Sequence, residues 1–362
     1  MARPLRASRL VGAALLLALG GAAAQPAIYA GFETLARVVL LIEKHHLGAP
    51  SVESLLAGAI AGATAAAGDP WTTFIPAAAV PPPLSDDADG IGLRVVAQGA
   101  DWAVAEVVPG GPAARAGLQP GLVLVAVNGQ PVPAPDAGGA DAAEAALAGA
   151  PGSRVQLTLR GPAGESTVAL VREAIFRPSV TVTPLAEGGR VLRIWRFRPG
   201  TARELAEAMG PTSGPVLLDL RGNPGGSIEE AAAAADLFLP AGEVAALAGR
   251  SPRPPLRSTD APADHTGPVG VWVDRHSASA AELLAAALQA RGRARVAGEP
   301  TAGKGTVQQL FPLEDGSLLR VTIATWAAPG RAPLHPGAPL VPDTALPPAA
   351  TAAEAAAALG LR

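Results

Sequence analysis

The sequence predicts a mixed α/β protein, in which a small β-rich module separates an N-terminal helical segment from a larger α/β domain. Three observations predict this order. Apolar residues recur at helical spacing within residues 32–67, alternate with a period of two within residues 86–175, and beyond residue 176 form strands that alternate with helices. At 362 residues the chain has room for two or three domains.

Composition excludes several classes of function. The net charge is -3 and no basic block is present, so the sequence does not favour a nucleic-acid partner. The chain has no cysteine, which excludes disulfides, thiolate chemistry and a lipid-modified cysteine anchor. The absence of cysteine leaves the redox compartment undecided.

Residues 1–24 have the layout of a secretory signal. Three arginines precede the short apolar run "VGAALLLALGGAAAQ", and cleavage is expected after Ala24. Because the apolar run is short, no stable membrane span is expected after cleavage. This pattern predicts an exported protein, in the periplasm or outside the cell; the alternative is an uncleaved N-terminal anchor.

Residues 25–85 are expected to form a helical segment and a linker. One helix is predicted over 32–46, and a second over 51–67 begins behind the candidate cap Ser51. Proline then breaks regular structure, so residues 68–90 are expected to be a linker. Adjacent His45 and His46 point to different sides of the first helix, which does not favour a metal site.

Residues 86–175 are expected to form a compact β domain with one helical piece at 141–150. Asn128-Gly129 and Gly161-Pro162 are turn signals. The expected strands are 102–108, 122–129, 154–161 and 166–174.

Three stretches of this module resemble a bacterial PDZ domain: "GIGL" (90–93), "VVPGGPAARAGLQPG" (107–121) and "VLVAVNGQPV" (123–132). Leu122 stands where such domains usually have aspartate. The resemblance implies that backbone N–H groups of the glycine loop hold a peptide carboxylate, and that the adjoining strand edge pairs with an extended peptide. The implied peptide-binding residues are Gly90, Ile91, Gly92 and Leu93.

Residues 176–362 alternate strands with helices, which predicts an α/β layer. The turn "RGNPGG" (221–226) has too few correctly spaced glycines for a nucleotide site, and no metal-ligand pattern is evident. The expected strands are 190–197, 215–220, 268–274, 294–300 and 317–326, and the expected helices are 201–210, 227–240 and 277–290. An ordered but irregular segment is expected over 328–348.

The stretch "SASAAE" (277–282) has two interpretations. Ser279 and Glu282 fit a capping box ahead of an apolar helix. A serine at a helix start is also well placed to be a nucleophile, because the first N–H groups of the helix can stabilise an oxyanion. Residues 277–282 alone leave both interpretations open, with Ser277 as the next candidate nucleophile.

Lys304 stands out because the chain has only two lysines, the other being Lys44. Arginine cannot give up its proton in a protein, whereas a desolvated lysine can and can then act as a general base for serine. Gln308 could orient the amine; the alternative is that Lys304 is a lysine by chance. A histidine-based triad is less favoured, because its candidates are too near Ser279 in sequence or lie in proline-rich loops (His276, His265 and His335).

Residues 273–309, "VDRHSASAAELLAAALQARGRARVAGEPTAGKGTVQQ", are similar to the core of the carboxyl-terminal processing (tail-specific) proteases. The resemblance implies a crotonase-like α/β core with an inserted PDZ domain. It implies Ser279 as nucleophile, Lys304 as base and Gln308 in support, with no cofactor or metal. The expected domains are residues 1–24 (signal), 25–85 (helical segment and linker), 86–175 (PDZ) and 176–362 (protease).

A second segment, residues 216–240, resembles the family's glycine-rich turn and helix. It implies an oxyanion hole formed by the backbone of Ala280 with Gly225, or with Gly226. Two departures concern the site. Ala281 replaces a third serine, which should be harmless, whereas Ala302 replaces an aromatic residue and predicts more water at the Lys304 amine.

These observations together predict an exported serine endopeptidase that captures protein C-termini through its PDZ domain. Its expected partners are unfolded proteins or proteins with an exposed C-terminus, and a homo-oligomer is left open. The alternatives are a catalytically silent PDZ adaptor and a small-ligand carrier on the same fold. Retention of Lys304 with Gln308 favours the enzyme, because a silent relative is free to lose them.

Overall fold

The computed structural model falls into two units, Met1–Asp69 and Pro70–Arg362. The expected signal segment, residues 1–24, lies outside the described residues. Within the described part of the chain, no helix has the length and hydropathy needed to cross a bilayer. The described residues are 26–361 except for 49, 78–79, 81–86, 136–142, 144–145, 186–187, 212 and 259–262.

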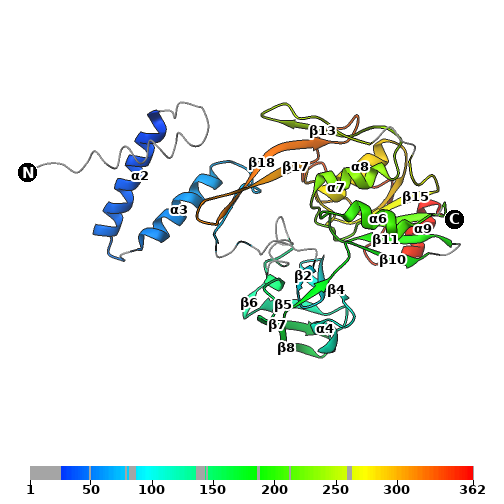
Figure 1. Ribbon diagram of the computed structural model, residues 1–362, viewed down its shortest axis with the longest axis horizontal. Coiled ribbons are helices and arrows are strands. Elements are labelled where there is room, and N and C mark those ends of the chain that lie inside the picture. The colour runs from blue at the N-terminus through cyan, green and yellow to red at the C-terminus, as the bar shows by residue number, and fades with distance from the viewer. Residues whose placement is uncertain are drawn as a thin grey trace, which may run out of the picture. The chain divides into compact units, whose positions relative to one another are not determined.

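The first unit contains two helices, α2 (Pro26–His45) and α3 (Val52–Ala65), drawn in blue in Figure 1. Both were expected, although α2 begins six residues earlier than its apolar spacing indicates, at Pro26 and not residue 32. Ser51 caps α3 as predicted: its Oγ accepts a hydrogen bond of 3.1 Å from the N–H of Ser54.

The β-rich module is a sheet in the order β3-β4-β5-β7-β8, with β6 on β5 and a separate β2–β9 pair. Its own apolar core includes Leu93, Trp102, Leu157 and Leu159. The expected helix at 141–150 lies partly outside the described residues. The elements are β2 (Asp87–Gly90), β3 (Leu93–Gln98), β4 (Asp101–Val107), α4 (Pro112–Arg115), β5 (Val123–Val127), β6 (Gln130–Pro131), β7 (Arg154–Gly161), β8 (Gly164–Val171) and β9 (Glu173–Phe176).

The larger domain is built on a sheet in the order β10-β11-β12-β15-β16-β19. From β11 to β19 neighbouring strands are parallel, and β10 joins the edge antiparallel. This is the α/β layer that the strand–helix alternation predicts. The strands are β10 (Val180–Pro184), β11 (Arg190–Ile194), β12 (Val216–Asp219), β15 (Val269–Val273), β16 (Arg295–Gly298) and β19 (Thr344–Ala345).

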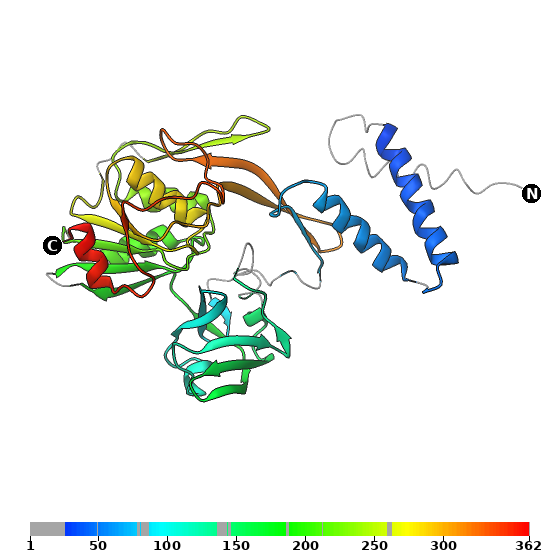
Figure 2. The ribbon, with the colours of Figure 1, turned by 180° about the vertical axis from the view of Figure 1, so that it is seen from behind.

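Helices cover both faces of this sheet (Figures 1 and 2). Because successive strand residues point to opposite faces, Leu218 of β12 packs in the cluster that contains residues of three helices, and its neighbour Leu217 packs with the C-terminal helix. This burial on both faces accounts for the fully apolar sequence of the central strand β15. The helices are α6 (Thr201–Met209), α7 (Ile228–Asp236) and α8 (Ala280–Ala290) on one face, and α9 (Ala352–Leu359) on the other.

A second sheet has the order β1-β18-β13-β14, with β17 also paired to β18. Its strand β1 corrects the expectation of a linker over 68–90, because residues 73–75 pair antiparallel with β18. The closing segment 328–348 is largely irregular as expected, but it contains β19, and α9 follows it. The strands are β1 (Thr73–Ile75), β13 (Gly242–Gly249), β14 (Leu256–Ser258), β17 (Thr306–Pro312) and β18 (Leu318–Ala327).

The parallel sheet brings three loops to one edge. Neighbours β12, β15 and β16 run in the same direction, so the segments that follow them emerge side by side. These segments are 220–227, 274–279 and 299–305. They carry the glycine-rich turn, the serine pair and Lys304.

Candidate active site

Ser279 occupies the N-cap position of α8 in a strained backbone conformation. Its φ is 53° and its ψ is -116°, and only Asn128 shares a positive φ among the described non-glycine residues. Such a conformation costs about 1–3 kcal/mol and persists where the surroundings enforce it, often at functional sites. The capping box of Ser279 with Glu282 is present, as the sequence predicts. A plain cap does not require the positive φ, so the backbone of Ser279 favours the nucleophile interpretation in addition to the cap.

Glu282 ties the serine to the lysine loop. Its Oε2 accepts hydrogen bonds from the backbone N–H of Ser279 at 2.8 Å and from that of Lys304 at 2.7 Å. Its Oε1 accepts from the Thr301 hydroxyl and the Gly303 N–H. The two backbone nitrogens thus share one oxygen atom, which brings residues 279 and 304 together.

The carboxyl group of Glu282 is fully buried. Burial raises the pKa of Glu282, and its four hydrogen-bond donors act in the opposite direction. Each of the two carboxylate oxygens accepts two hydrogen bonds, and this arrangement suits the ionised form of Glu282.

The two residues that flank Lys304, Gly303 and Gly305, have no room for a side chain. A Cβ on Gly303 would lie 2.3 Å from the carbonyl oxygen of His335, and one on Gly305 would lie 2.3 Å from that of Leu334. The backbone of a distant segment therefore crowds around the half-buried lysine, as its glycine neighbours predict. In addition, the Ala302 N–H donates to the Ser277 carbonyl at 3.1 Å, a second link between the two loops.

Gln308 lies on β17, two residues beyond Thr306. Its amide nitrogen donates to the Thr306 hydroxyl at 2.8 Å and to the Thr322 hydroxyl at 3.4 Å. These threonines fix the nitrogen end of the amide, whereas the role expected of Gln308 uses its oxygen.

The two candidate oxyanion glycines lie in different surroundings. A Cβ on Gly225 would lie 2.7 Å from the Ser279 Cβ and 3.0 Å from the Ala280 nitrogen, so Gly225 directly contacts the serine. A Cβ on Gly226 would instead meet the Phe197 carbonyl oxygen at 1.9 Å. The structure therefore brings Gly225 together with Ser279 and Ala280, and places Gly226 against the backbone of Phe197.

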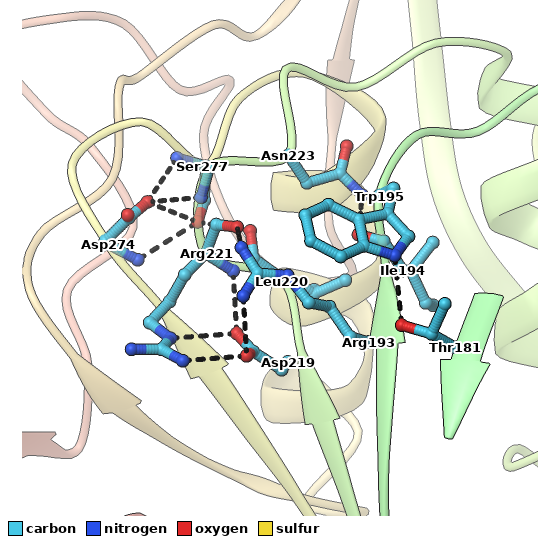
Figure 3. Close-up of polar contacts among 11 residues, drawn as sticks. Thr181, Arg193, Ile194, Trp195, Asp219, Leu220, Arg221, Asn223, Asp274 and Ser277 are labelled. Atoms are coloured by element: carbon cyan, nitrogen blue, oxygen red, sulfur yellow. Dashed lines mark hydrogen bonds and ion pairs between the residues drawn. The ribbon is translucent and has the colours of Figure 1, made fainter. Parts of the chain in front are cut away.

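The Gly225 N–H already has an acceptor. It donates to the Oδ1 of Asn223 at 2.8 Å, while the Asn223 amide donates to the Ile194 carbonyl at 2.8 Å. Asn223 is fully buried and is drawn in Figure 3. In this conformation Asn223 holds the Gly225 N–H, and the Ala280 N–H begins the first turn of α8, where N–H groups lack intrahelical acceptors.

Ser277 has a structural role in the same loop cluster (Figure 3). Its hydroxyl donates to the Leu220 carbonyl at 2.8 Å and accepts from the Asp274 N–H at 3.0 Å. Its side chain is fully buried. Ser277 thus joins the end of β12 to the turn after β15, and its hydroxyl is engaged on both sides.

The four predicted peptide-binding residues lie at the start of the β-rich module. Gly90 ends β2, and Gly92 has a φ of +72°, a value that glycine adopts readily. Ile91 and Leu93 are 2% and 1% exposed, so these residues offer backbone and not side-chain contacts. The adjoining strand β3 is an edge of its sheet and can accept a further strand.

Sequence reasoning did not assign Trp71 or Asn223 to the site. Trp71 lies over Lys304, with its ring centroid 4.0 Å from the Nζ. Nothing in the sequence connects these two residues. Asn223 lies within the glycine-rich turn, two residues before Gly225. This position was the one feature of the sequence that could have assigned Asn223 to the site.

Comparison with known proteins identifies the families that the two domains match. The sequence pattern of peptidase family S41 matches residues 190–345, and that of the PDZ domain matches residues 103–161. The carboxy-terminal processing protease CtpA of Bacillus subtilis is 30% identical over 285 residues, which cover 76% of this chain and 60% of that protein. Residues 190–345 therefore form a domain of peptidase family S41. This confirms the carboxyl-terminal processing family that the serine and lysine motifs indicate.

Two further comparisons define how far the likeness extends. A CtpA-like serine protease of Staphylococcus aureus is 31% identical over 73% of this chain and 53% of its own length. The chain thus spans between half and two thirds of the curated relatives it matches. The solved photosystem II D1 C-terminal processing protease has a TM-score of 0.61 and 24% identity, covering 90% of this chain and 96% of that structure. This last likeness concerns the fold, and together with the two family matches it confirms the expected protease core with a PDZ domain.

Proposed function

We propose that this protein is a serine endopeptidase in which Ser279 is the nucleophile and Lys304 the general base. The observation that carries the proposal is the strained backbone of Ser279 at a helix start, joined through Glu282 to the loop of the rare lysine. Strain of this kind at an otherwise ordinary cap indicates a functional position.

The reaction follows from these positions. The Ser279 Oγ attacks the peptide carbonyl carbon while the neutral Lys304 amine accepts the hydroxyl proton. Collapse of the tetrahedral intermediate breaks the C–N bond, and the Lys304 ammonium returns the proton to the leaving amine. Water then hydrolyses the acyl-enzyme with Lys304 again as base. Gln308 orients the amine through its amide oxygen.

The oxyanion requires two backbone donors. Ala280 supplies one from the first turn of α8, and Gly225 is the better second candidate because it contacts Ser279. Since Asn223 accepts the Gly225 N–H in this conformation, that peptide must turn away from Asn223 before it can donate to the oxyanion.

Substrate capture is assigned to the PDZ domain. The backbone of Gly90–Leu93 would hold the terminal carboxylate, and the unpaired edge of β3 would pair with the last residues of the peptide. The protein substrates are unfolded or have an exposed C-terminus, and the arginine-led apolar start of the sequence supports export.

The direct test is cleavage of an unfolded reporter with an apolar C-terminus. The wild-type protein should cut it internally, and Ser279→Ala should reduce the rate to background, as measured by gel and mass spectrometry. Binding of the reporter without cleavage would instead indicate the silent adaptor.

A further inference from the structure

Lys304 has an aromatic neighbour that comes from a distant part of the chain. The Nζ of Lys304 lies 4.0 Å from the centroid of the Trp71 ring, well inside the range of a cation–π contact. Residue 302, two positions before Lys304 in the same loop, is alanine and provides no aromatic ring. Trp71 thus supplies an aromatic wall that residues 301–305 lack.

Trp71 is held in place by the sheet that carries Gln308. Its carbonyl accepts a hydrogen bond of 3.2 Å from the Arg320 Nε, and the neighbouring Thr72 hydroxyl accepts one of 3.2 Å from the Thr322 N–H. Strand β1 then continues the pairing with β18 (Figure 2), and Thr73 lies opposite Arg320 in the register. The backbone that carries the ring is therefore held by β18 and does not depend on the lysine.

We propose that Trp71 is a positioning residue for Lys304, whose indole face holds the amine in place and stabilises its protonated form. A ring face attracts an ammonium ion but not a neutral amine to the same degree. In the proposed reaction Lys304 becomes positively charged as Ser279 attacks, so the ring favours the charge that develops. The kinetic consequence rests on the proposed function, whereas the contact itself does not.

Other charged groups near the lysine come from three elements. Glu282 of α8 accepts the Lys304 N–H, Arg320 of β18 bonds the Trp71 carbonyl, and His335 packs its backbone on Gly303. A substitution of Trp71 changes none of these side chains. Better access of water would raise the pKa of Lys304 in such a variant, so a decrease can be assigned to the loss of the ring face.

The chain's two lysines make a direct measurement feasible. Protein labelled with ¹³C at the lysine Cε gives two NMR signals, and Lys44→Arg identifies the one from Lys304. Trp71→Leu, which removes the ring but keeps apolar bulk, should lower the pKa of Lys304 by roughly 0.5–1.5 units. Trp71→Phe should give a smaller decrease, because phenylalanine keeps a weaker ring face.

Thr73→Val is the matched control. It removes from the same segment a buried hydroxyl that has no hydrogen-bond partner among the described residues, leaves the ring and its supporting contacts in place, and should leave the Lys304 titration unchanged. An unchanged or raised pKa in Trp71→Leu would overturn the proposal, since the ring would then only fill space or exclude water. If Trp71→Leu does not fold, as judged by thermal unfolding, the same two outcomes are read from Trp71→Phe.

Kinetics provide a second readout of the same idea. At a pH where Lys304 is neutral, Trp71→Leu should lower kcat by about 2- to 30-fold with little change in KM. An equal rise in KM with unchanged kcat would contradict a positioning role. Because the NMR titration can be repeated in Ser279→Ala protein, it remains informative even if no peptidase activity is found.

Discussion

At the scale of single residues, Ser279 has a backbone conformation that suits glycine better than serine. Ser279→Gly should therefore raise the free energy of unfolding by about 1 kcal/mol while abolishing cleavage. Ser279→Ala should also abolish cleavage, but it keeps the strain, loses the cap and should lower the free energy of unfolding by about 1 kcal/mol. Denaturant unfolding measures both. A Ser279→Gly protein less stable than Ser279→Ala would argue that the conformation is not strained.

Ser277 is the matched comparison for Ser279. Its buried hydroxyl bonds Leu220 and Asp274, so Ser277→Ala should destabilise the fold by about 1–3 kcal/mol. The variant should nevertheless retain cleavage at temperatures where it is folded. Complete loss of activity in folded Ser277→Ala would move the nucleophile to this position.

His276 gives the site a pH-dependent stability. Burial lowers the pKa of His276 below its ordinary value of 6.5, although the nearby Asp274 acts in the opposite direction. The Arg275 Nε donates to its Nε2 at 3.1 Å, a bond that requires the neutral ring. The unfolded chain therefore binds the proton first, and stability should fall as the pH drops from 6.5 towards the lower folded-state pKa.

The check is the pH dependence of thermal unfolding in His276→Gln. Glutamine can still accept from Arg275 but does not titrate, so the decrease below pH 6.5 should be smaller than in the wild type. Identical pH profiles would show that His276 does not contribute to this dependence.

At the scale of elements, the lysine loop depends on close backbone packing. Gly305→Ala would place a Cβ 2.3 Å from the Leu334 carbonyl oxygen, and the required shift should cost about 1–3 kcal/mol and displace Lys304. Activity should fall together with stability. Gly58→Ala in α3 is the control, because a Cβ there meets nothing within 4 Å and should be neutral or stabilising. Full activity in Gly305→Ala would contradict this account of the loop.

Elements with a local signal could be predicted, and those without one could not. The buried strand 216–219 begins with three consecutive apolar residues, and α8 follows a recognisable cap, so both were expected. Strand β1 has only three residues in a proline-rich stretch, and its pairing with β18 depends on contacts distant in sequence. For the same reason Lys304 was identified as a candidate from its rarity, whereas its neighbour Trp71 was not.

At the scale of the whole molecule, the order of helices, β-rich module and α/β layer followed from the change in apolar period along the chain. The element that packs against each buried face could not be predicted in the same way. The spacing of apolar residues shows which face of a helix or strand is buried, but not which other element covers it. The hydrogen bond from the Gly225 N–H to Asn223 could not be predicted either, because it depends on the orientation of the peptide bond before Gly225.

The assignment of substrate capture to the PDZ domain makes a prediction about the substrate's terminus. If the backbone of Gly90–Leu93 holds a carboxylate, amidation of the reporter's C-terminus should raise KM or slow cleavage by about tenfold, the loss of one charge-assisted contact of roughly 1.4 kcal/mol. Steady-state kinetics on the two reporters measure this. Equal kinetics for the free acid and the amide would remove the PDZ domain from substrate capture.

The central claim is that Lys304 accepts the proton of Ser279, and the chain offers an unusually well-matched pair of variants for testing it. Lys304→Arg and Lys44→Arg make the same chemical change at the only two lysines. Both keep a positive charge of similar reach, but arginine cannot act as the base.

The decisive measurement is the rate of reporter cleavage by these two variants at saturating substrate and neutral pH. Lys304→Arg should lose a factor of about 100 or more, while Lys44→Arg should match the wild type. Thermal unfolding of both variants checks that they are folded. A Lys304→Arg protein that still cleaves the reporter at near wild-type rate would contradict the Ser–Lys mechanism.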